Sequence, residues 1–149
     1  MFATKPLMTH WLLVASFLFS MMGCSGGGEG LAEVKGKILY KGKAVPNGTV
    51  NFLPADPNKP SATGRIQADG SYALETYLGS RPSQGAVIGK HKVVIVAMQD
   101  MESRLPEDRI PLPPPIVPIK YTSPATSDLT AEVEDKENTI NFDLQDPGK

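Results

Sequence analysis

The chain has 149 residues, with 15 Lys and Arg side chains against 16 Asp and Glu side chains and a formal net charge of −1. This length is typical of a single domain. A nearly neutral chain lacks the concentrated positive surface that nucleic-acid binding requires, so we expect no nucleic-acid partner. Cys24 is the only cysteine, which excludes an intramolecular disulfide and leaves packing alone to stabilise the fold.

Residues 1–23 have the pattern of a signal peptide. Lys5 is the only Lys or Arg among them, and an apolar run extends from Trp11 to Met22. Because a membrane-spanning helix needs about 20 apolar residues, this shorter run favours a cleaved export signal over a permanent transmembrane segment. Gly23 supplies the small residue that a signal peptidase requires before the cut, and Cys24 follows it directly.

The junction Met21-Met22-Gly23-Cys24 resembles the lipobox of bacterial lipoproteins. The match lies at Gly23 and Cys24, whereas Met21 and Met22 depart from the leucine and the small residue that are commoner there. The resemblance implies cleavage before Cys24, a diacylglycerol on its sulfur and acylation of the new N-terminus. Two or three acyl chains hold a protein durably, at about 0.8 kcal/mol per buried methylene. An ordinary secretory signal followed by an incidental free thiol is the alternative.

Residues 24–30 form a predicted tether. Residues 25–30 contain four glycines, and such a stretch has few side chains to bury and behaves as a flexible linker. We therefore expect an exported protein that is anchored by lipid in a bacterial cell envelope. By resemblance to lipoprotein sorting, Ser25 rather than Asp directly after the cysteine favours the outer membrane over the inner one.

From residue 31 onward, the alternation of apolar and polar residues predicts β-strands. Val34 to Tyr40 forms the first such run, and a period of two with polar outer residues indicates a half-buried strand. A turn region follows over 41–48. Val50 and Phe52 then continue the inward pattern of apolar residues.

The middle of the chain contains the strongest hairpin signal and the longest β-branched run. Two alternating segments surround Asp69-Gly70, a dipeptide that favours a β-hairpin turn. Residues 77–88 follow as a looser stretch. Four consecutive β-branched residues, Val93 to Val96, then predict a central strand that is covered on both sides.

A proline-rich segment separates this strand from the C-terminal part. Residues 99–127 contain seven prolines, and proline is unfavourable in helix interiors and central strands, so Leu112 to Pro118 is predicted to be a polyproline II segment that crosses the surface. Apolar residues alternate with polar ones again over 129–133 and 140–144, which predicts two further strands with one face toward the core. Together these runs predict one all-β domain over residues 31–145, a seven-stranded antiparallel β-sandwich.

Three stretches resemble the carboxypeptidase regulatory-like, transthyretin-like domains, and they lie within 34–48, 64–72 and 89–93. The C-terminal part, with Lys120-Tyr121 and Phe142-Asp143-Leu144, resembles the same domain in a group of small bacterial lipoproteins. The resemblance implies a seven-stranded prealbumin-like sandwich with no assigned chemistry. We accordingly expect neither an enzyme activity nor a cofactor.

His91 is the only histidine after residue 23. It has the parity of Val93 and Ile95, which points it toward the core, so a structural role is favoured over a catalytic one. The transthyretin-like hydrolases that act on hydroxyisourate need more than one histidine and a distinctive C-terminal signature. That branch of the family is therefore not expected.

Two charge clusters have alternative interpretations. Acidic residues late in the chain could bind a hard cation, and these are Glu132, Glu134, Asp135 and Glu137. However, a calcium-loop motif is missing, and acidic side chains on the outer face of a strand usually face water. The early lysines are Lys35, Lys37, Lys41 and Lys43. They could face lipid head groups, but the favoured interpretation is that they protect an edge strand from pairing with another chain.

Candidate binding residues lie on predicted loops. Aromatic side chains are common stacking platforms, and preformed polyproline II loses little entropy when it docks to a partner. For the proline segment, however, a rigid crossover between sheets is favoured over docking. We expect a non-catalytic binding or structural module of the envelope. The alternative is a carbohydrate- or protein-ligand receptor, whose candidate residues are Tyr77, Tyr121, Pro113, Pro114 and Pro115.

Overall fold

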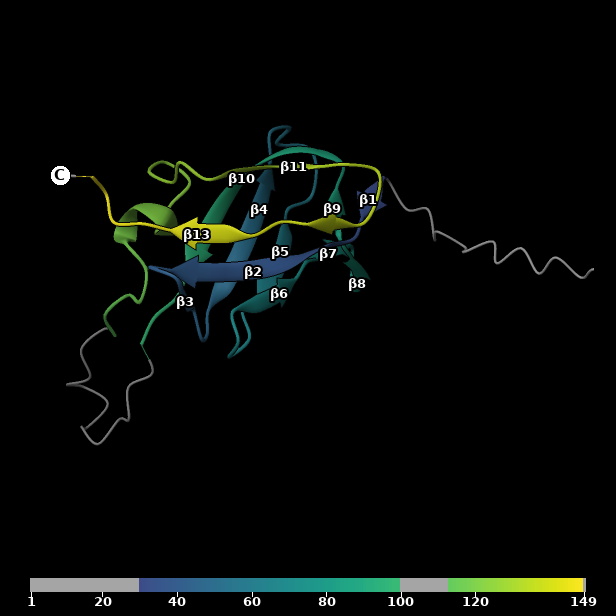
Figure 1. Ribbon diagram of the computed structural model, residues 1–149. Coiled ribbons are helices and arrows are strands. Elements are labelled where there is room, and N and C mark those ends of the chain that lie inside the picture. The colour runs from purple at the N-terminus through teal and green to yellow at the C-terminus, as the bar shows by residue number, and fades with distance from the viewer. Residues whose placement is uncertain (1–29, 100–112, 149) are drawn as a thin grey trace, which may run out of the picture.

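The computed structural model describes residues 30–99 and 113–148 and shows an all-β protein (Figure 1). The described residues form three sheets and contain no α-helix. The predicted signal peptide, the lipidation candidate Cys24 and most of the predicted tether lie outside the described residues.

The larger sheet has six strands, and each neighbouring pair in it is antiparallel. Val93, Val94 and Ile95 are all buried, so both faces of their strand are covered, which confirms the predicted central strand. Their strand, β10, lies between two others. The spatial order is β11 (Thr130–Val133), β10 (Gly89–Val96), β4 (Thr49–Pro54), β5 (Ala62–Arg65), β7 (Glu75–Leu78) and β8 (Arg81–Gln84).

The second sheet is organised around β2 (Val34–Tyr40). Antiparallel partners lie on one side of it, and these are β3 (Lys43–Ala44) and β6 (Ser71–Ala73). Parallel partners lie on the other side, namely β12 (Asn138–Thr139) and β13 (Phe142–Leu144). These two pairs differ from the fully antiparallel arrangement predicted. Parallel neighbours need a long crossover, and here the whole larger sheet lies between β2 and β12 along the chain.

A short two-stranded sheet completes the described fold, with β1 (Leu31–Ala32) antiparallel to β9 (Ala86–Val87). The described residues therefore contain thirteen strand segments, several of them only two residues long. This segmentation confirms the all-β class but not the count of seven strands.

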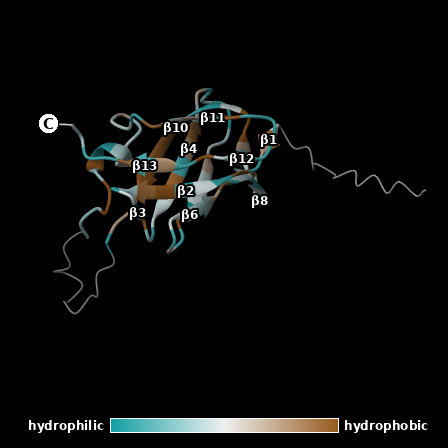
Figure 2. Ribbon diagram, viewed as in Figure 1, coloured by the Kyte–Doolittle hydropathy of each residue, from teal (hydrophilic) through white to brown (hydrophobic). Residues whose placement is uncertain are grey.

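The core lies between the larger sheet and the β2 sheet. Phe52 of β4 is fully buried, and its ring centre lies 6.3 Å from that of Tyr72 on β6 and 6.1 Å from that of Phe142 on β13. Figure 2 shows the most hydrophobic residues on the strands that face each other and hydrophilic residues in the connections. The arrangement is therefore that of a β-sandwich, as the alternating pattern predicts.

The predicted turn region contains a two-residue hairpin. Lys41 (φ 52°) and Gly42 (φ 74°) join Tyr40 to Lys43, which are paired across β2 and β3. Positive φ at both central residues matches the twist of the adjoining strands. The turn chemistry expected over 41–48 is therefore confirmed, although the hairpin uses Lys41-Gly42.

The predicted hairpin around Asp69-Gly70 is wrong. The turn itself forms, because Gly70 has φ 80° and the Asp69 carboxylate accepts a hydrogen bond from the Ser71 amide at 3.0 Å. However, β5 before the turn pairs with β4 and β7, whereas β6 after it pairs with β2. The chain passes from one sheet to the other here.

Candidate functional site

The described part of the proline segment pairs with the residues that follow β10. The Ile116 amide donates to the Ala97 carbonyl at 2.9 Å, and the Gln99 amide donates to the Pro114 carbonyl at 3.0 Å. Pro114 and Pro115 are exposed. The segment is thus fastened along one end of the sandwich, while Leu112, with which the predicted polyproline II segment begins, lies outside the described residues.

Tyr121 belongs to the core and not to an exposed loop surface. It lies in η2 (Ile119–Thr122), a short 3₁₀ helix, and only 4% of it is exposed. Its hydroxyl donates to the Gln145 carbonyl at 3.0 Å, directly after β13. The expectation that Tyr121 offers a stacking face to a ligand is therefore wrong, because burial of the ring and its hydrogen bond dock η2 onto the sandwich.

Tyr77 is 61% exposed and lies on β7, where its cross-strand partner is Pro82 of β8. Figure 1 shows β7 and β8 at the end of the sandwich where the chain enters β1, whereas η2 lies at the opposite end. The structure therefore separates Tyr77 from Pro113, Pro114 and Pro115, and the candidate binding residues do not form one site.

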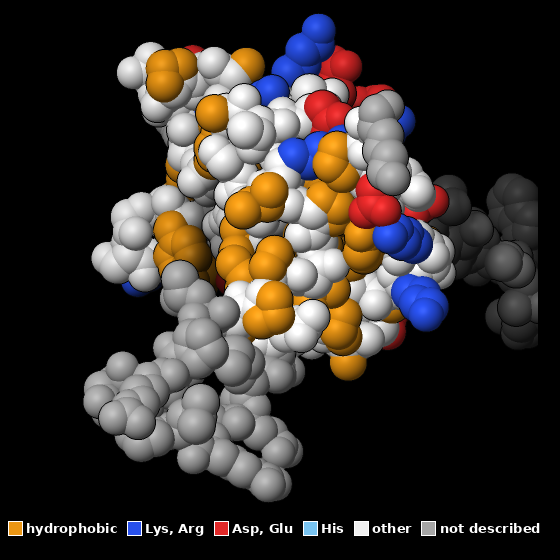
Figure 3. All heavy atoms as spheres, turned by 90° about the vertical axis from the view of Figure 1, so that its left-hand side faces the viewer, with side chains coloured by type: hydrophobic (Ala, Val, Ile, Leu, Met, Phe, Trp, Pro, Cys, Tyr) orange, Lys and Arg blue, Asp and Glu red, His pale blue; other side chains and the backbone are white. Residues whose placement is uncertain are grey.

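Among residues 30–99 and 113–148, the exposed large hydrophobic side chains other than Tyr77 lie at the end that carries η2. Ile119 is 76% exposed and Met98 is 39% exposed. Met98 forms an antiparallel bridge with Pro115, which places both beside the proline segment. We refer to Met98, Pro114, Pro115, Ile116 and Ile119 as the apolar end. Figure 3 faces this side of the molecule and shows hydrophobic side chains spread across it.

His91 is buried, as its parity predicts. It is 3% exposed, its Nδ1 lies 3.0 Å from the Gly89 carbonyl oxygen, and its ring centre lies 5.8 Å from that of Phe52. Its Nε2 has no hydrogen-bond partner among the described residues. Burial lowers the pKa of His91 below its ordinary value of 6.5, because a charged imidazolium is poorly solvated there.

We expect His91 to make the fold sensitive to mild acid. Since its folded-state pKa is lowered, the unfolded chain takes up a proton first, so stability is lost as the pH falls below about 6.5. His91→Phe should remove this component of the loss. Urea unfolding at about pH 7.5 and about pH 5 should therefore show a smaller decrease in the unfolding free energy for the variant than for the wild type. Equal decreases would contradict the assignment.

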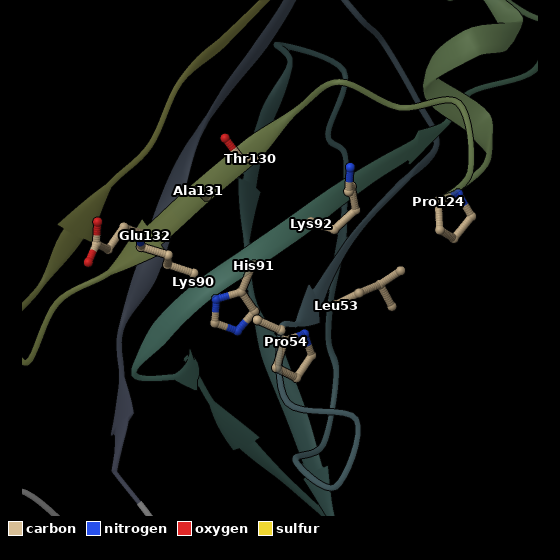
Figure 4. Close-up of a pocket in the computed structure, with 10 residues that line it drawn as sticks. Leu53, Pro54, Lys90, His91, Lys92, Pro124, Thr130, Ala131 and Glu132 are labelled. Carbon is tan, nitrogen blue, oxygen red and sulfur yellow. The ribbon is translucent and has the colours of Figure 1, made fainter.

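A shallow groove of about 650 Å³ crosses β4, β10 and β11. Figure 4 shows Leu53 and Pro54 along it, with the Lys92 side chain extending away from the His91 ring. The Lys92 ammonium donates to the Ser127 carbonyl at 3.2 Å. The groove thus combines apolar walls with charged rims, and no side chain of the described residues forms a hydrogen bond with Nε2 of the buried His91. Nor do any three His, Cys, Asp or Glu side chains within 30–99 and 113–148 meet as metal ligands.

The early lysines do not protect an edge strand at Lys35 and Lys37. Both lie on β2, which has neighbours on both sides. Three of the four form ion pairs: Lys35 with Glu137, Lys37 with Asp69 at 3.5 Å, and Lys41 with Asp146 at 2.6 Å. Local alternation cannot distinguish a central strand from an edge strand, so the edge interpretation is wrong for β2.

The late acidic residues are exposed. Glu134 pairs with Lys136, and Glu137 pairs with Lys35. The turn that carries them is organised by Asn138, which is 6% exposed and whose side-chain oxygen accepts from the Glu134 amide at 3.0 Å. Its amide nitrogen donates to the Lys136 carbonyl at 2.6 Å.

Comparison of the chain with known protein families, with curated protein sequences and with solved structures finds no match. Within the described ranges, no helix has the length and apolarity needed to cross a membrane.

Proposed function

We propose that the chain is an exported envelope lipoprotein, anchored through lipid on Cys24, whose β-sandwich is a non-catalytic binding or structural module. One observation carries this proposal. The Gly23-Cys24 junction ends an apolar run, and the first strand begins at Leu31, only seven positions after the cysteine. A lipid on Cys24 would hold the folded domain close to a membrane, and two or three acyl chains suffice for durable anchoring.

We further propose that the domain is of the transthyretin-like class, with a seven-stranded prealbumin-like sandwich over residues 31–145. Two facing sheets and a central β10 support this assignment. The residues that carry the family resemblance in the C-terminal part also have structural roles that suit it. Tyr121 docks η2, and Phe142 packs on Phe52. Ser25 after the cysteine favours delivery to the outer membrane.

The anchor can be tested by Cys24→Ala. We expect wild-type protein in the membrane fraction and the variant in the soluble exported fraction, because loss of all acyl chains removes the hydrophobic anchor. Ser25→Ala is the matched control and should stay with the membranes. Immunoblotting of fractionated cells measures the distribution. A Cys24→Ala protein that sediments with membranes as the wild type does would contradict the proposal.

A protein-ligand receptor is the second candidate function, and the exposure of Ile119 and Met98 favours it. Exposed aliphatic residues fit a protein partner better than a carbohydrate, which usually stacks on aromatic rings. A photo-crosslinking residue at position 119 in intact cells should give discrete adducts, whereas the same residue at exposed position 67 should give none. Adduct patterns that are identical at the two positions would contradict this second candidate.

A further inference from the structure

The position of Cys24 limits how far the folded domain can lie from a lipid bound there. Gly30 follows Cys24 by six residues, and an extended chain advances at most about 3.5 Å per residue, so Gly30 lies within about 20 Å of the anchor. The Gly30 carbonyl accepts a hydrogen bond from the Ile88 amide at 2.8 Å. A lipid on Cys24 would therefore hold the end of the sandwich that carries Gly30 and Ile88 closest to the bilayer.

Two corners of the fold at this end are polar. The loop over 55–61 adjoins Gly30, since Asn58 and Gly30 line the same pocket. The turn over 134–137 lies there too, because the Asn138 amide donates to the Glu33 carbonyl at 2.8 Å.

The hairpin that joins β7 and β8 is the third corner at this end. The Leu74 amide donates to the Val34 carbonyl at 2.9 Å, and the Thr76 hydroxyl donates to the Gly85 carbonyl at 2.8 Å. From this point β7 continues away from the apolar end. Figure 1 shows β7 and β8 on the same side of the molecule as β1.

The chemistry of the three corners differs. The turn over 134–137 carries three acidic side chains, and the loop over 55–61 carries Asp56 and Lys59. The hairpin instead presents Tyr77, 61% exposed, and exposed Arg81, which forms no ion pair among the described residues. Its one acidic residue, Glu75, lies at the start of β7, paired with Gln84 and away from the turn over 79–80. Tyrosine is enriched at membrane–water interfaces, and cations are attracted to anionic head groups, which repel carboxylates.

We propose that the β7–β8 hairpin is the membrane-contacting surface of the domain, with Tyr77 and Arg81 among the lipid head groups, so that the apolar end points away from the bilayer. This inference rests on the proposed anchoring at Cys24. It assigns Tyr77 to a lipid surface instead of to a soluble ligand. It also places Ile119 on the part of the domain that faces away from the membrane.

The chain is well suited to a direct test. Cys24 is the only thiol, and the only tryptophan is Trp11, which lies in the segment proposed to be cleaved. The exported form that begins at Cys24 can be coupled through this thiol to vesicles that contain a maleimide phospholipid and anionic lipid. Tyr77→Trp then introduces a single fluorophore at the hairpin, and Ile119→Trp introduces one at the apolar end. Brominated lipids quench only tryptophan that reaches the interface.

We expect quenching of tryptophan at position 77 to be at least about twice that at position 119, because interfacial side chains lie within about 5–10 Å of the acyl boundary. Arg81→Glu in the Tyr77→Trp protein should reduce the quenching toward the value for position 119. Pro82→Trp, cross-strand from position 77, is a second probe that should behave as position 77 does. Circular dichroism confirms folding of each variant.

Equal quenching at positions 77 and 119, or stronger quenching at 119, would overturn the proposed orientation. Because the attachment is chemical, that result would not bear on native lipidation. Conversely, an unmodified Cys24 in cells would overturn the proposed function and leave the quenching result unchanged.

Discussion

Gly36→Ala is expected to destabilise the fold severely. Gly36 lies in the middle of β2, and a Cβ built there would overlap the Ile140 carbonyl oxygen and approach the Tyr72 ring to 3.1 Å. The carbonyl cannot easily move, because the Tyr72 hydroxyl donates to it at 2.7 Å and the Ile140 amide donates to the Lys35 carbonyl at 2.8 Å. We expect the free energy of unfolding to fall by about 3–5 kcal/mol, a large part of the total stability of a small domain.

Urea unfolding followed by circular dichroism measures this loss. Gly148→Ala is the matched control, since a Cβ there meets nothing within 4 Å, and its unfolding free energy should equal that of the wild type. A Gly36→Ala protein within about 1 kcal/mol of the wild type would show that Ile140 does not pass as close to β2 as described. β12 and β13 are interrupted at this point, where the Ile140 carbonyl accepts from the Tyr72 hydroxyl and the Lys37 amide donates to the Asn141 side chain at 2.8 Å.

Phe52→Ala should be the second most damaging substitution. The Phe52 side chain is fully buried, and its ring contacts Tyr72, Phe142 and His91 from three different strands. Removing the ring loses its burial energy and leaves a cavity between the two sheets, so we expect a loss of about 3–5 kcal/mol. The change in the midpoint of urea unfolding, at constant slope, measures it.

Phe52→Leu is the informative control for this position. Leucine retains much of the buried volume, so its loss should be clearly smaller than that of alanine. Similar losses for the two variants would argue that aromatic ring contacts, and not the filled volume, determine the stability at the junction of the sheets. A negligible loss for Phe52→Ala would contradict the two-sheet core.

The alternation of residues predicts burial well where a strand has one buried face. Val34, Ile38, Val50 and Phe52 are all fully buried, because side chains alternate across a strand whatever its neighbours are. His91 follows the same rule. These predictions depend only on local geometry, which the sequence contains.

Strand partners could not be predicted in the same way. Asp69-Gly70 has the chemistry of a tight turn, but that chemistry is the same whether the next strand pairs back or crosses to the other sheet. The hairpin of β7 and β8 was missed for the opposite reason. Its strands are mostly exposed, so they show little alternation of apolar and polar residues. The one local signal is Gly79 in the turn between them, with φ 69°.

The candidate binding residues illustrate the same limit. Nothing local distinguishes Tyr121 from Tyr77, yet one is buried and the other exposed. The burial of Tyr121 depends on the Gln145 carbonyl, which lies 24 positions further along the chain. The exposure of Ile119 likewise depends on how η2 docks onto the sandwich. A single isoleucine between a proline and a lysine belongs to no repeating apolar pattern, so its exposure cannot be inferred from the sequence.

The central claim is the lipid on Cys24, and intact mass spectrometry of the protein extracted from native membranes tests it most directly. Our account predicts a single species that begins at Cys24, lacks residues 1–23, and carries a diacylglycerol on the sulfur together with an N-terminal acyl chain. A membrane-associated protein with a free Cys24 thiol, or one that retains residues 1–23, would contradict it.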